Sequence, residues 1–149
     1  MFDLKNIVII LPLILGFLIG FFTKPGNNYV KLKKSELNPP SYLFGIVWSI
    51  LYLLIGFSYY LVLKKKSNWM FWIIPIVHLI LNFSFSIVFF KFNNLFLSAV
   101  VTTLTLITAL MVLNQFYRIN KKVLLLFIPY IIWLSFATYL AWSIYFLNR

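Results

Sequence analysis

Cysteine is absent from this sequence and acidic residues are rare. Its 149 residues include one histidine and two acids, Asp3 and Glu36. The lack of cysteine excludes a disulfide-stapled secreted module, thiolate catalysis and a Cys-ligated zinc site. Neither acid lies within a long apolar run. The sequence also has no paired carboxylates, Ser-His-Asp arrangement, phosphate-binding loop or cluster of metal ligands. Because these motifs are absent, the sequence assigns no catalytic residue and no metal site through them.

Charged residues of either sign are scarce, at 10% of the chain, whereas 63% of the residues are hydrophobic. An average soluble domain has roughly 25% charged residues. Because so few charges cannot cover a water-facing surface, we exclude a soluble globule, and the high hydrophobic content excludes a disordered chain. The composition predicts a polytopic membrane protein with a single domain over residues 1–149.

The thirteen Lys and Arg residues give the chain a net charge of +11. In a soluble protein this charge would suggest nucleic acid as a partner. Here the basic residues lie in short clusters between apolar runs, as in membrane proteins that contact anionic headgroups. We therefore expect a lipid bilayer and no nucleic acid. About seven basic residues fall on one side of the predicted bundle and six on the other, so the positive-inside rule assigns no orientation.

Five apolar runs predict an all-α bundle of five transmembrane helices, since a span needs about 20 apolar residues. The runs are continuous and lack the alternation of a membrane β-barrel. The first run resembles a signal peptide in length, but no small-residue cleavage site follows it, and we interpret it as a helix. The predicted helices cover residues 7–22, 43–63, 69–90, 95–116 and 123–147.

Three of these helices carry aromatic and polar side chains at helical spacing. If their faces converge, they form an aromatic pocket suited to a flat, apolar ligand with polar edges. The alternative is that the aromatic residues pack the bundle or form an interfacial belt. The three faces are Trp48, Tyr52, Ile55 and Tyr59; His78, Asn82, Phe85 and Phe89; and Tyr130, Trp133 and Ala137.

Three further features allow two interpretations each. His78 is a candidate haem ligand, although a lone intramembrane histidine more often forms a hydrogen bond with a neighbouring helix. Gly16-x-x-x-Gly20 indicates close helix packing, with a dedicated dimer seam as the alternative. A loose cholesterol pattern, which often arises by chance in aromatic helices with basic ends, is matched by Leu140, Tyr145 and Arg149.

The chain also carries a series of motifs in a familiar order, and together they resemble the TspO/MBR family of tryptophan-rich sensory proteins and mitochondrial translocator proteins. The match extends over nearly the whole chain. The motifs are Pro39-Pro40 before Phe44-Gly45-Ile46-Val47-Trp48-Ser49-Ile50-Leu51-Tyr52, Leu81-Asn82 with Phe89-Phe90, Phe116-Tyr117-Arg118, and Pro129-Tyr130-x-x-Trp133-x-Ser135-Phe136-Ala137-Thr138-Tyr139-Leu140.

This resemblance implies a five-helix bundle, often dimeric, in a bacterial envelope membrane or the mitochondrial outer membrane. It implies a pocket roofed by the loop between the first two helices, with porphyrin or haem as ligand and no required cofactor. Some members also bind sterols or benzodiazepine-type drugs. By position, Tyr29 and Pro40 would line the roof. The pocket wall would comprise Trp48, Asn82, Phe85, Trp133 and Ala137.

The resemblance implies a membrane receptor or binding protein for tetrapyrroles that acts in their transport or in stress-linked regulation. Basic loop residues, Lys31, Lys33 and Lys34, are expected to pair with the propionates. One alternative is a light-dependent porphyrin-degrading enzyme, because in some bacterial members the tryptophans matching Trp48 and Trp133 are linked to that reaction. A second alternative, a secondary transporter, is disfavoured by the odd number of helices and the lack of intramembrane carboxylates.

Overall fold

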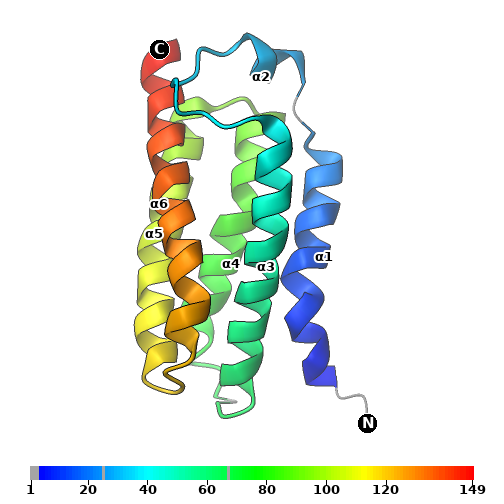
Figure 1. Ribbon diagram of the computed structural model, residues 1–149, viewed down its shortest axis with the longest axis vertical. Coiled ribbons are helices and arrows are strands. Elements are labelled where there is room, and N and C mark those ends of the chain that lie inside the picture. Colours follow the sequence, from blue (N-terminus) through cyan, green and yellow to red (C-terminus); the bar gives the residue numbers. More distant parts are fainter. Residues whose placement is uncertain (1–3, 25, 67) are drawn as a thin grey trace.

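The computed structural model describes residues 4–24, 26–66 and 68–149, in which five long helices run side by side along one axis (Figure 1). A short helix, α2, lies across the end of the bundle in the connection between the first two. A 3₁₀ turn, Leu4–Asn6, precedes α1. The helices are α1 Ile7–Phe22, α2 Asn27–Lys31, α3 Ser41–Leu63, α4 Ile73–Ser86, α5 Leu95–Tyr117 and α6 Val123–Asn148.

The long helices are suited to a bilayer. Within the described residues, four spans are long and apolar enough to cross a membrane, and α1 is an apolar helix of 16 residues. Large apolar side chains cover the outside of the bundle: Ile80, Leu125 and Ile132 are 62%, 77% and 66% exposed. Such a surface is stable in lipid and not in water. The protein is a multi-pass integral membrane protein, as the composition predicts.

The predicted helices agree with the observed ones to within two residues at each end, except in the third. That prediction began at Trp69, whereas α4 begins at Ile73, because residues 69–72 form turns in which the Asn68 side chain accepts a hydrogen bond from the Met70 amide. At its other end α4 continues as a π-helical turn, Ile87–Lys91. Neither this turn nor α2 was predicted.

Packing between α1 and α3 depends on a glycine that the sequence analysis did not single out. A Cβ atom on Gly56 of α3 would overlap the backbone carbonyl of Ile9 in α1, so only glycine allows this approach. In the predicted Gly16-x-x-x-Gly20 pair, Gly16 faces the ring of Tyr52, while a Cβ on Gly20 would meet open space. Within the bundle, Gly16 therefore makes room for the Tyr52 side chain and not for a helix backbone.

The end of the bundle opposite α2 is densely packed with aromatic rings. The ring of Tyr59 in α3 lies 5.0 Å from Phe116 in α5, and Phe116 lies 6.2 Å from Phe127 in α6, both edge to face. All three side chains are buried. The end of the bundle nearest α2 is packed differently, because it contains a cavity.

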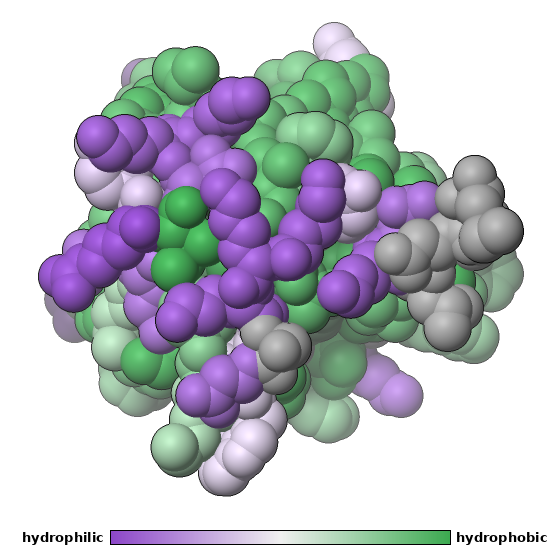
Figure 2. Space-filling view, turned by 90° about the horizontal axis from the view of Figure 1, so that it is seen from below, coloured by the Kyte–Doolittle hydropathy of each residue, from purple (hydrophilic) through white to green (hydrophobic). Residues whose placement is uncertain are grey.

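Both ends of the bundle are basic. Figure 2 shows the end where α3 joins α4 and α5 joins α6, with hydrophilic side chains gathered over apolar ones. The exposed basic residues at this end are Lys5, Lys64, Lys65, Lys66, Arg118, Lys121 and Lys122. The opposite end carries Lys24, Lys31, Lys33, Lys34, Lys91 and Arg149. This distribution places cations at both headgroup layers.

Candidate functional site

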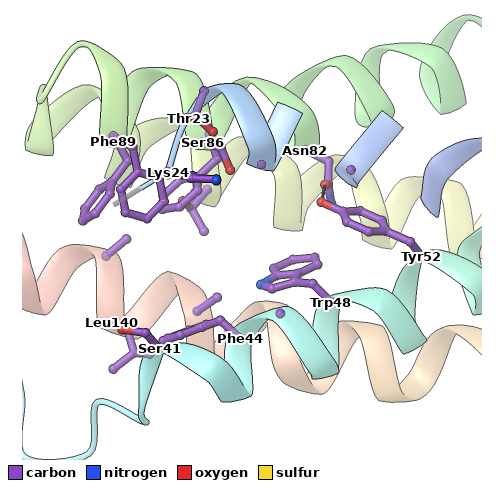
Figure 3. A pocket seen from close by; sticks show the side chains of 18 of the residues that line it. Thr23, Lys24, Ser41, Phe44, Trp48, Tyr52, Asn82, Ser86, Phe89 and Leu140 are labelled. Carbon is purple, nitrogen blue, oxygen red and sulfur yellow. Dashed lines mark hydrogen bonds between the residues drawn. The ribbon is translucent and has the colours of Figure 1, made fainter. Parts of the chain in front are cut away.

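A cavity of about 540 Å³ lies inside the bundle at the end covered by α2. Residues from all five long helices line it, and Figure 3 shows a slot with aromatic side chains on both sides. A cavity of this size falls within the range of small-molecule sites, roughly 300–1,000 Å³. Its aromatic lining consists of Phe17, Phe21, Tyr29, Phe44, Trp48, Tyr52, Phe85, Phe89 and Phe90.

One wall of the cavity comes from α3. Phe44, Trp48 and Tyr52 are spaced four residues apart, so they share one face of the helix. The rings of Trp48 and Tyr52 lie 5.5 Å apart and are tilted by 33°. Trp48 also meets the edge of Tyr130 in α6 at 6.2 Å. These contacts hold the Trp48 indole in the wall, where its face borders the open space (Figure 3).

The facing wall comes from α4 and its π-helical extension. Phe85 and Phe89 are stacked, with ring centroids 5.3 Å apart. One turn before Phe85, the buried Asn82 points toward the cavity beside Tyr52. The Tyr52 hydroxyl donates a hydrogen bond of 3.0 Å to Asn82 Oδ1. The wall is therefore aromatic along most of its length and polar at one end.

Tyr29 of α2 closes the cavity from above. Its ring lies 5.9 Å from Phe89 and 5.5 Å from Phe90, because the wide π-helical turn directs two consecutive rings toward α2. Lys34 lies over the same ring at 4.3 Å and donates a hydrogen bond of 2.8 Å to the Tyr29 carbonyl. The covering segment is thus held to the bundle by ring contacts, while the cation–π contact of Lys34 stabilises the segment itself.

The structure brings together most of the residues predicted for the pocket. Tyr29, Trp48, Asn82, Phe85 and Ala137 all line the cavity. The other two predicted residues lie outside it. Pro40 is exposed at the start of α3. Trp133 packs against Phe44, with ring centroids 5.8 Å apart, and of these two residues only Phe44 lines the cavity.

The cavity also has lining residues that the sequence prediction did not assign. The whole contribution of α1 was missed, although Gly16 and Gly20 at a spacing of four residues mark the face involved. Tyr52 and Phe89 belong to the helical faces that the spacing predicts for the pocket, and Phe44 shares the face of Trp48 and Tyr52, so the same spacing identifies it. Lys24 was not recognisable, because only the fold shows which loop lysine reaches the cavity.

Among the lysines expected to meet a ligand, the placement differs from the prediction. Lys24 lines the cavity, whereas Lys31 and Lys33 are exposed outside it. Lys34 is used within the loop, where it donates to the carbonyls of Tyr29 and Leu32. Within the part of the chain that the structure describes, the cationic group at this cavity is therefore that of Lys24.

His78 lies in the core below the cavity and is fully buried. Both of its ring nitrogens have hydrogen-bond partners: Nδ1 lies 2.9 Å from the Tyr59 hydroxyl and Nε2 lies 2.7 Å from the Tyr130 hydroxyl. His78 therefore joins neighbouring helices, and neither nitrogen faces a place for a haem iron. Within the described residues, no group of three or more His, Asp or Glu side chains forms a metal site.

The residues of the cholesterol pattern do not form one surface. Leu140 is buried and lines the cavity. Tyr145 instead packs on Phe96 of α5 at 5.4 Å, and Arg149 lies over Phe146 at 5.1 Å. A sterol on the outside of the bundle would not contact Leu140.

Comparison with known proteins agrees with this architecture. The sequence matches the TspO/MBR family over residues 8–147. The chain belongs to the TspO/MBR family. The Tryptophan-rich protein TspO of Bacillus cereus is 33% identical over 156 residues, which cover 99% of this chain and 100% of that protein. The corresponding protein of Chlorobaculum tepidum is 35% identical over 144 residues, covering 93% of this chain and 91% of the relative.

Similarity within the TspO/MBR family extends to eukaryotes. The human Translocator protein is 27% identical over 122 residues, which cover 78% of this chain and 72% of the human protein. The resemblance that the motifs suggested is therefore confirmed at the level of the family.

Proposed function

We propose that this TspO/MBR protein binds a tetrapyrrole in the cavity between its helices. The observation that carries the proposal is the slot itself, about 540 Å³ in volume, with Trp48 on one wall and the stacked pair Phe85 and Phe89 on the other. A flat macrocycle placed between two aromatic walls buries both of its faces and gains offset-stacking contacts.

The polar groups of the cavity suit the edges of such a ligand. Asn82 and Tyr52 provide hydrogen-bonding groups at one end of the slot, and Lys24 lies toward the end covered by α2 (Figure 3). Propionate groups carry negative charge and form strong, charge-assisted hydrogen bonds with ammonium groups. We infer that the ligand enters with its carboxylates toward Lys24 and its apolar edge toward α5.

The biological role that we propose is the handling of tetrapyrroles in the membrane, either their movement or their sensing. The names of the relatives point in these two directions, since one is called a translocator protein and another, from Cereibacter sphaeroides, a tryptophan-rich sensory protein. A cavity with a hydrogen-bonded cover can serve either role.

Titration of the purified protein with protoporphyrin tests the proposal. In the unaltered protein we expect saturable binding, followed by the absorbance of the porphyrin. Trp48→Leu should weaken binding about tenfold, because a well-placed aromatic pair contributes about 0.5–1.5 kcal/mol beyond its buried area. Trp69→Leu is the matched control, since Trp69 is 72% exposed and lies outside the cavity. Equal affinities of the two variants would refute this site.

A further inference from the structure

A chain of hydrogen bonds connects the cavity to the buried core, and the proposed function does not account for it. The Tyr52 hydroxyl donates to Asn82 Oδ1, and Asn82 Nδ2 donates to the Tyr130 hydroxyl at 2.6 Å. The Tyr130 hydroxyl lies 2.7 Å from Nε2 of His78, whose Nδ1 lies 2.9 Å from the Tyr59 hydroxyl. This series of hydrogen bonds ends at the carbonyl of Pro75, which accepts from the Tyr59 hydroxyl at 2.9 Å.

The direction of this chain follows from counting donors, starting at its buried end. A carbonyl can only accept, so the single proton of the Tyr59 hydroxyl is committed to the Pro75 carbonyl. In the hydrogen bond between Tyr59 and His78, the Tyr59 oxygen must therefore be the acceptor. Nδ1 of His78 must carry the proton of this hydrogen bond and donate it to Tyr59.

The same count fixes the rest of the chain. His78 is buried among aromatic side chains, and a buried charge without a partner is costly, so its imidazole is neutral. Since the proton of the imidazole is on Nδ1, Nε2 is an acceptor, and the Tyr130 hydroxyl donates a hydrogen bond to it. Tyr130 then has only lone pairs left for Asn82, which must turn its amide nitrogen toward Tyr130 and its oxygen toward Tyr52.

Building on the proposed function, we propose that His78 is a positioning residue that sets the polarity of the cavity by acting through Tyr130 on Asn82. Within the described residues, the second N–H of Asn82 has no partner, and the oxygens of Asn82 and Tyr52 each keep a free lone pair. Because Asn82 and Tyr52 both line the cavity, we infer that its wall offers an amide donor next to two acceptors.

This pattern defines the ligand edge that the site recognises. A ligand oxygen at this end of the slot can accept from Asn82 Nδ2, and a ligand N–H, such as that of a pyrrole, can donate to Tyr52 or to Asn82 Oδ1. A reversed amide would instead place the nitrogen beside Tyr52. The tautomer of His78 therefore selects between ligands that it does not touch.

The first test needs no ligand. His78 is the only histidine in the chain, so ¹⁵N-histidine labelling of the protein gives one pair of ring signals in an NMR spectrum. We expect a protonated Nδ1 and an unprotonated Nε2. A proton on Nε2, or on both nitrogens, at neutral pH would overturn the assigned donors and acceptors of these hydrogen bonds, and the proposal with them.

The second test compares two amide variants by titration with protoporphyrin. His78→Gln places an amide oxygen near the position of Nε2 and keeps an acceptor for Tyr130, so its affinity should stay within about twofold of the unaltered protein. His78→Asn places its amide near Nδ1 and leaves the Tyr130 proton without an acceptor. Its affinity should fall about three- to tenfold, as expected for one misdirected hydrogen bond.

A control separates this effect from the general loss of a bond between helices. Thr103→Val removes the acceptor of the Trp142 indole N–H, a 2.8 Å bond between α5 and α6 in which neither partner lines the cavity. This variant should bind protoporphyrin normally. Equal affinities of the Gln and Asn variants would overturn the positioning role. Absence of binding by the unaltered protein would instead refute the proposed function, while the NMR spectrum would still decide the direction of the chain.

Discussion

Gly56 determines how closely α1 can approach α3, because any side chain there would overlap the Ile9 carbonyl. We expect Gly56→Ala to lower the free energy of unfolding by about 1–3 kcal/mol, the usual cost of overpacking a buried contact. The measurement is thermal unfolding of the purified protein in detergent. Because α1 also forms part of the cavity, protoporphyrin binding should weaken in the same variant.

Gly45 provides a matched control on the same helix. A Cβ atom there would meet nothing within 4 Å, so Gly45→Ala should leave the stability unchanged or raise it slightly through helix propensity. If the two alanine variants unfolded at the same temperature, the close approach of α1 and α3 would not be important for the bundle.

The two tryptophans of the family motifs, Trp48 and Trp133, differ in whether they line the cavity, and the difference depends on the packing of single side chains. Trp48 lines the cavity, whereas Trp133 lies against Phe44 and Phe136. The family motifs predict that both tryptophans line the pocket. Helical spacing cannot test this prediction for Trp133, because it shows only that Trp133 shares a face with Tyr130 and Ala137. Whether the ring reaches the open space depends on Phe44 of another helix, and no pattern within one helix contains that information.

At the scale of elements, the cover over the cavity is attached to α6. The Asn148 side chain accepts from the Lys33 amide at 2.9 Å and donates to the Lys33 carbonyl at 2.8 Å, as a neighbouring β-strand would. Ser35 and Tyr139 form a third hydrogen bond, of 3.0 Å, between the same segments. These bonds close the loop that carries Tyr29 onto the end of the bundle.

We expect Asn148→Ala to release this attachment. Two hydrogen bonds of about 0.5–1.5 kcal/mol each are lost, so the Lys33 amide should exchange with solvent at least about fivefold faster. Hydrogen exchange followed by mass spectrometry on the segment around Lys33 measures this change. Asn114→Ala, which replaces an exposed asparagine of α5, is the control. Unchanged exchange in the Asn148 variant would show that the loop is held by other contacts.

The elements differ in how well the sequence predicts them. The long helices follow directly from their apolar runs, and α1 was predicted with its observed ends. The short helix Asn27–Lys31 lies in a polar loop with no apolar period, and its position depends on Tyr29 meeting Phe89 and Phe90. The π-helical turn Ile87–Lys91 continues an apolar run without any change in composition. Only tertiary contacts therefore distinguish the short helix from an irregular loop and the π-helical turn from a continued α-helix.

At the scale of the whole molecule, the bundle is divided into a packed half and a hollow half. Aromatic rings such as Tyr59, Phe116 and Phe127 fill the end opposite α2, while the other end leaves space between the five long helices. Composition predicts the membrane bundle, because apolar length and basic clusters act on the whole chain. The position of the cavity was predictable only in part, since it requires three helical faces and α1 to meet.

The structure of the complex with protoporphyrin, determined experimentally, tests the central claim most directly. We predict that the macrocycle lies in the slot in contact with Trp48 and Phe85, with its carboxylates toward Lys24 and Tyr29 closed over it. A macrocycle bound on the lipid-facing surface, or a cavity that remains empty at saturating porphyrin, would contradict the account.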